Sequence, residues 1–105
     1  MTLRTGLLRR ILKQVFQSPL ERERDFYDRF RQLSDRIETG PDSITHYVLR
    51  GELFIERGEY GRARADFEAA LELAEAVDLN ASWGLLEQVM RDRALQGIAL
   101  ANRRG

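Results

Sequence analysis

The sequence of 105 residues contains no cysteine, two prolines and one histidine, and it has no long apolar run. Without cysteine there is neither a disulfide framework nor a thiolate metal site. No apolar run approaches the ~20 residues that cross a membrane. The N-terminus also lacks the uninterrupted apolar core of ~7–15 residues that marks a secretory signal. We therefore expect a cytoplasmic protein without disulfides.

Residues suited to catalysis are equally scarce. The single histidine, His46, has no cysteine, second histidine or nucleophile motif to work with. The carboxylates alternate with arginines at helical spacing, which indicates solvated helix faces and not acid–base pairs. No Gly-rich phosphate loop is present. We expect a protein that is not an enzyme, with no catalytic residue, no metal ligand and no cofactor.

Leu, Ala, Arg and Glu dominate the composition, and all four favour helix. No stretch alternates apolar and polar residues over the length of a strand, so the sequence predicts an all-α fold with about five helices. A capping box at Ser18 to Glu21 should start the second helix, Gly40 should end it, and Gly58 should separate the third from the fourth. Residues 1–105 should form a single domain, with helices expected over 2–17, 19–38, 43–57, 60–77 and 81–102.

Residues 1–39 contain two amphipathic helices, and the first is basic. It could pack on the rest of the domain, lie on a membrane surface, act as a mitochondrial presequence or be captured by a partner protein. The side chains that form this predicted amphipathic helix are Leu3, Arg4, Leu7, Leu8, Arg9, Arg10, Ile11, Leu12, Lys13, Val15 and Phe16.

The stretch 44–77 carries a pattern of bulky, small and aromatic residues. In order these are Tyr47, Gly51, Phe54, Gly58, Tyr60, Ala63, Phe67 and Ala70. In type and spacing the pattern resembles a tetratricopeptide repeat, in which small residues let two antiparallel helices approach closely and aromatic residues fill the space around them.

The sequence departs from the family pattern at two positions of this repeat. Arg50 stands where the family has leucine, and Glu75 stands where it has proline. The helix at 81–102, with apolar positions at Trp83, Leu86, Val89, Met90 and Ile98, has Glu87 at the expected small position. We therefore interpret that helix as a cap and not as a second repeat.

The resemblance also implies a ligand groove, because the first helix of each such repeat lines a concave surface. The implied groove residues are Thr45, Val48, Glu52, Ile55 and Glu56. This apolar and acidic strip lacks the Lys, Arg and Asn of grooves that hold acidic chaperone tails. Its complement would be an apolar, basic helix or peptide, and helix 2–17 is the nearest candidate.

Charge is unevenly distributed along the chain, with a net +4 over 1–36, −7 over 37–90 and +3 over 91–105. The acidic middle and a pI of about 6.6 argue against a nucleic-acid partner. We expect an adaptor or scaffold that binds a protein or peptide. The alternatives are a membrane-surface adaptor anchored by 2–17 and a structural subunit of a larger complex. A single repeat cannot bury its own faces, so we also expect a homodimer.

Overall fold

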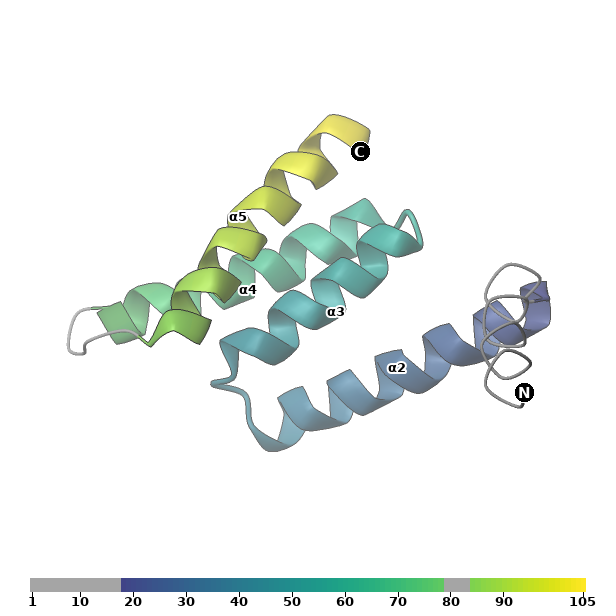
Figure 1. Cartoon of the computed structure of the whole chain (residues 1–105), viewed down its shortest axis with the longest axis horizontal. Helices are drawn as coiled ribbons and strands as arrows, with labels where there is room; N and C mark the ends of the chain where they lie inside the picture. The colour runs from purple at the N-terminus through teal and green to yellow at the C-terminus, as the bar shows by residue number, and fades with distance from the viewer. Residues whose placement is uncertain (1–17, 79–83) are drawn as a thin grey trace, which may run out of the picture.

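The computed structural model describes residues 18–78 and 84–105, and these contain four α-helices and no strand. The helices are α2 (Pro19–Thr39), α3 (Ile44–Glu56), α4 (Tyr60–Asp78) and α5 (Leu85–Arg104), shown in Figure 1. The all-α prediction is confirmed. The expected count of about five included the helix at 2–17, which lies outside the described residues.

The ends of α2 follow the local sequence signals. The Ser18 side chain accepts a hydrogen bond from the backbone N–H of Glu21 at 3.1 Å, and Pro19 occupies the first turn. At the other end the N–H of Gly40 donates to the carbonyl of Arg36. Both terminal turns therefore have partners for part of their unpaired backbone groups.

A tight turn joins α3 to α4 and requires glycine at its centre. Gly58 has a φ of +74°, a left-handed conformation that other residues rarely adopt. Its N–H donates to the carbonyl of Ile55, while the N–H of Glu59 donates to that of Phe54 at 2.9 Å. This pair of bonds is the Schellman arrangement that ends a helix, and it turns the chain back so that α4 runs antiparallel to α3.

The start of α5 differs from the prediction. The helix begins at Leu85 and not near 81. Gly84 occupies the N-cap, where no side chain accepts a hydrogen bond. The orientation of α5 must therefore depend mainly on its packing against the rest of the protein.

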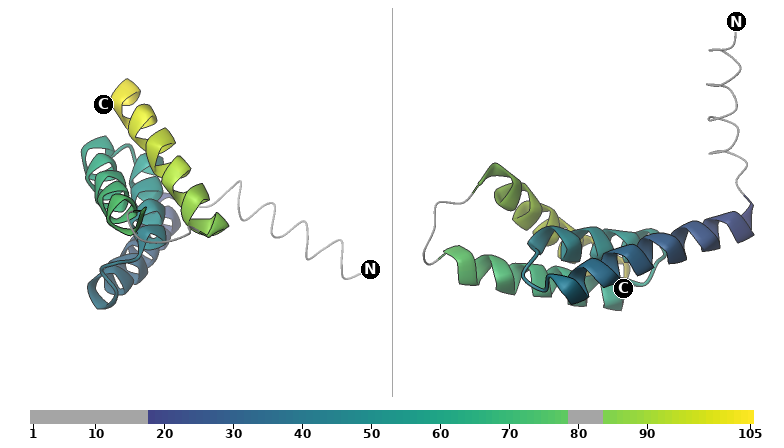
Figure 2. Two further views of the ribbon diagram at one scale, coloured as in Figure 1. Left: turned by 90° about the vertical axis from the view of Figure 1, so that its left-hand side faces the viewer. Right: turned by 90° about the horizontal axis from the view of Figure 1, so that it is seen from below.

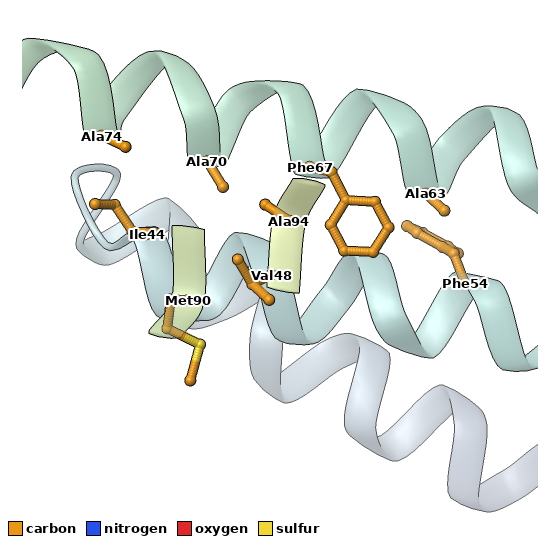
Figure 3. Packing of buried hydrophobic residues seen from close by; sticks show 9 residues of the cluster. All are labelled: Ile44, Val48, Phe54, Ala63, Phe67, Ala70, Ala74, Met90 and Ala94. Carbon is orange, nitrogen blue, oxygen red and sulfur yellow. The ribbon is translucent and has the colours of Figure 1, made fainter. Parts of the chain in front are cut away.

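The α3–α4 hairpin forms the centre of the protein, with α2 and α5 on opposite sides of it (Figures 1 and 2). In the described residues α2 packs on α3, whereas α5 contacts both α3 and α4. Figure 3 shows the core between these helices, where alanines keep the backbones close and larger side chains fill the remaining space. The cluster comprises Ile44, Val48, Phe54, Ala63, Phe67, Ala70, Ala74, Met90 and Ala94.

The apolar face expected for the last helix is only partly the buried one. Leu86 and Val89 are exposed, at 56% and 42% of their surface, whereas Met90 is buried and Ile98 packs against the core. Trp83 lies outside the described residues. The side that faces the hairpin instead carries small residues at helical spacing after Met90, namely Ala94, Gly97 and Ala101. Small side chains give a weak hydrophobic signal, which explains why the prediction favoured larger apolar residues such as Leu86 and Val89.

Candidate functional site

The eight positions that carry the repeat pattern all lie in the α3–α4 hairpin or its turn. Phe54, Ala63, Phe67 and Ala70 are buried together with Gly51, whereas Tyr47 and Tyr60 are half-buried and Gly58 is exposed in the turn. Phe67 is fully buried, and a Cβ added at Gly51 would lie 2.7 Å from its ring. A Cβ added at Gly97 of α5 would also collide with that ring. The ring of Phe67 thus fits between two glycines on different helices.

Arg50 makes polar contacts with two other helices. Its Nε and Nη2 atoms donate to the two carboxylate oxygens of Asp66 on α4 at 2.8 and 2.7 Å, and Nη1 donates to Ser34 of α2 at 3.2 Å. Asp66 is buried, and its hydrogen bond raises the pKa of Arg50. One side chain thus connects three helices by a bidentate pair and a hydrogen bond.

The implied groove residues do not form a continuous exposed strip. Val48 is fully buried in the core cluster, and Ile55 packs against it. Thr45 and Glu52 are half-buried, and only Glu56 is exposed. Val48 therefore contributes packing and no ligand surface.

Glu52 has a partner within the chain. Its carboxylate accepts a hydrogen bond from Nε of Arg93 at 2.9 Å, and Nη2 of Arg93 forms a second close contact with it. The bond raises the pKa of Arg93. The basic C-terminal part of the sequence thus meets the acidic middle here, and α5 occupies part of the surface expected for a ligand.

An open groove lies between α2 and α3. It consists of two adjoining cavities of about 470 and 290 Å³ that share Arg29, Leu53 and Glu56. Apolar side chains from both helices line it, and Glu52 borders the smaller cavity. The lining residues of what we term the α2–α3 groove are Arg22, Glu23, Asp25, Phe26, Arg29, Gln32, Leu33, Leu49, Glu52, Leu53, Glu56 and Arg57.

Arg57 closes one end of the α2–α3 groove. Its guanidinium lies 4.3 Å from the ring centre of Phe26 and donates to Glu23 of α2 at 2.7 Å. The bond to Glu23 raises the pKa of Arg57. By contrast, no ion pair involves Glu56 or Arg29 among residues 18–78 and 84–105. The two unpaired charges therefore lie where the two cavities meet.

No group of three or more His, Cys, Asp and Glu residues within 18–78 and 84–105 could hold a metal ion. No helix of the described part of the chain is long and apolar enough to cross a membrane. The Nδ1 atom of His46, in the first turn of α3, is buried and has no hydrogen-bond partner in the part of the chain that the structure describes.

No family model, no curated protein and no solved structure matches the chain.

The α2–α3 groove was not foreseen from the sequence, because it depends on how α2 lies against α3. Leu49 and Leu53 could have indicated it, because they follow Thr45 at intervals of four residues and therefore lie on one side of the same helix.

Proposed function

We propose that the protein is a non-enzymatic interaction module of the tetratricopeptide type, which binds an apolar, basic helix or peptide in the α2–α3 groove. The observation that carries this proposal is the combination, in one open groove, of Leu33, Leu49 and Leu53 with an exposed Glu56 that forms no ion pair within residues 18–78 and 84–105. Ligand sites are usually concave and mostly apolar, with a few polar groups that orient the ligand. The groove is concave, and its apolar part consists of Phe26, Leu33, Leu49 and Leu53, whereas its other lining residues are polar or charged.

The shape of the groove suits a helix better than a compact small molecule. The lining residues of α2 extend from Arg22 to Leu33, which corresponds to about 17 Å of helix at ~1.5 Å per residue. A ligand helix of about three turns would match this length and could place leucine-like side chains over Leu49 and Leu53.

Charge would orient the ligand more than it would hold it. Glu56 favours a Lys or Arg on the ligand, and Arg29 favours an acidic or carbonyl group beside it. Exposed ion pairs contribute only ~0–1 kcal/mol each, so apolar burial must supply most of the affinity. A ligand with an apolar face and a basic flank therefore fits the groove best.

The test is calorimetric titration of the full-length protein with a synthetic peptide of residues 2–17, which is basic, free of acids and rich in leucine. Glu56→Lys should weaken binding about fivefold or more, which corresponds to ~1 kcal/mol. Glu68→Lys is the matched control, because Glu68 is exposed on α4, away from the groove. Equal affinities for the two variants would rule out the α2–α3 groove as the binding site.

A further inference from the structure

The outer face of α5 is unusually poor in charge. It lies opposite the side that carries Met90, Ala94 and Ala101, and its Leu85 is 78% exposed. Charged residues make up 32% of the whole sequence, yet only one of the seven residues of this face is charged. The α5 outer face consists of Leu85, Gln88, Val89, Asp92, Leu95, Gln96 and Ala99, and all seven are exposed.

Such a face is typical of a contact surface. Contact regions between proteins are depleted in charge at their centre, and exposed clusters of large apolar side chains mark sites where another surface binds. The exposed face of α2 makes the contrast clear, since it carries Glu21, Arg24, Asp28 and Arg31. Helix formation alone therefore does not account for the composition of α5.

The α5 outer face reads almost the same in both directions from Asp92. Three residues away lie Val89 on one side and Leu95 on the other. Four residues away both positions are glutamine, and seven residues away both are aliphatic, Leu85 and Ala99. When two identical helices cross antiparallel about a two-fold axis, residues equally distant from the axis meet. In such a pair Val89 would meet Leu95 of the other copy, and Leu85 would meet its Ala99.

The charges at the centre fit the same arrangement. Arg91 and Asp92 are both exposed, and neither has an ion-pair partner among residues 18–78 and 84–105. Arg93 is already bonded to Glu52. In an antiparallel pair centred on Asp92, each Arg91 lies within one residue, ~1.5 Å along the axis, of the other copy's Asp92. Two reciprocal ion pairs would then offset the approach of the two carboxylates.

We propose that α5 is the contact surface of a homodimer in which two copies of α5 pack antiparallel about a two-fold axis beside Asp92. The second copy is the occupant because this face matches itself in its apolar residues and its glutamines, and because Arg91, beside the face, can pair with Asp92 of the other copy. None of the residues that line the α2–α3 groove belongs to α5. The dimer therefore does not depend on the proposed ligand site.

The first test is light scattering coupled to size exclusion over a concentration series. The full-length protein should reach twice its monomer mass of 12.2 kDa. Leu95→Glu and Val89→Glu should each weaken dimerisation at least about tenfold, because each places a carboxylate in an apolar contact. Leu20→Glu is the control, since Leu20 is 68% exposed on α2, outside the contact. A monomer at every concentration, or a dimer that the α5 variants leave intact, would overturn the proposal.

The second test determines whether the two copies of α5 pack antiparallel. Because the chain contains no cysteine, a single introduced cysteine can crosslink only to its own copy in the partner. Under mild oxidation the Asp92→Cys variant should form a disulfide-linked dimer, because the two copies of residue 92 face each other at the axis. The Ala99→Cys variant should not, because its two copies lie about 21 Å apart along the helices and a disulfide requires Cα atoms within ~7 Å. Crosslinking at residue 99 and not at 92 would contradict the antiparallel arrangement.

Discussion

Arg50 on α3 and Asp66 on α4 form a two-pronged ion pair across the centre of the hairpin, with both donor–acceptor distances below 3 Å. The carboxylate is buried, whereas about a fifth of the Arg50 side chain is exposed. Arg50 therefore supplies the partner that the buried Asp66 carboxylate needs, because an unpaired charge is costly to bury.

We predict that Arg50→Leu destabilises the protein by about 2–3 kcal/mol, because it leaves the Asp66 carboxylate buried without its partner. The double variant Arg50→Leu with Asp66→Leu should regain most of this loss, since no unpaired charge remains. Urea unfolding of the wild type, the two single variants and the double variant completes the cycle. Additive losses in the double variant would show that the pair contributes little.

We predict that Gly51→Ala and Gly97→Ala each lower the free energy of unfolding by about 1–3 kcal/mol, because each added methyl group collides with the fully buried ring of Phe67. Gly61→Ala is the control, because a Cβ there meets nothing within 4 Å. Alanine at 61 should instead stabilise the protein by about 0.5–1 kcal/mol through its higher helix propensity. Thermal melts of the three variants would distinguish crowding from propensity.

We predict that Arg57→Leu loosens the N-terminal half of α2 and leaves the hairpin intact. Arg57 bonds to Glu23 and covers the ring of Phe26, so it attaches this part of α2 to the end of α3. Hydrogen exchange should become faster at the amides of residues 22–30 and stay unchanged in α4. Faster exchange throughout the protein would indicate a general loss of stability instead.

We predict that exchanging the charges of Glu52 and Arg93, by Glu52→Arg together with Arg93→Glu, largely restores the stability lost in either single variant. Both side chains are about one-third exposed, so each single loss should stay near or below ~1 kcal/mol in low salt. Added salt should reduce the difference between the variants further. A double variant no better than the single ones would mean that geometry, and not charge, sets this contact.

The sequence allowed the hairpin to be located because its pattern lies within 34 consecutive residues. Within that stretch Gly58 indicates the turn between the two helices. The contacts that link separate helices were harder to foresee. Asp66 lies 16 residues from Arg50, and Arg93 lies 41 residues from Glu52, so helical periodicity gives no indication of either pair. Once Asp66 is known to face α3, however, the departure at Arg50 is explained.

The inner face of the last helix was predicted only in part, for a different reason. Leucines dominate a hydrophobicity pattern, so Leu86 appeared to face the core and Glu87 appeared to occupy the small position. The contact instead uses Ala94, Gly97 and Ala101, because the Phe67 ring already fills the space between the helices. A stripe of small residues at intervals of three and four was the available signal. The α2–α3 groove depends on the angle between two helices, which no local pattern encodes.

The position of Phe67 between Gly51 and Gly97 has a consequence for how such sequences can diverge. One ring on α4 lies against both α3 and α5, so a side chain gained at either neighbouring position destabilises the protein while the phenylalanine remains. Related chains should therefore vary at these three positions in concert, with a smaller residue at 67 accompanying a larger one at 51 or 97. A lineage that loses the ring first would pass through a loosely packed intermediate, and one that gains the methyl group first would pass through a strained one.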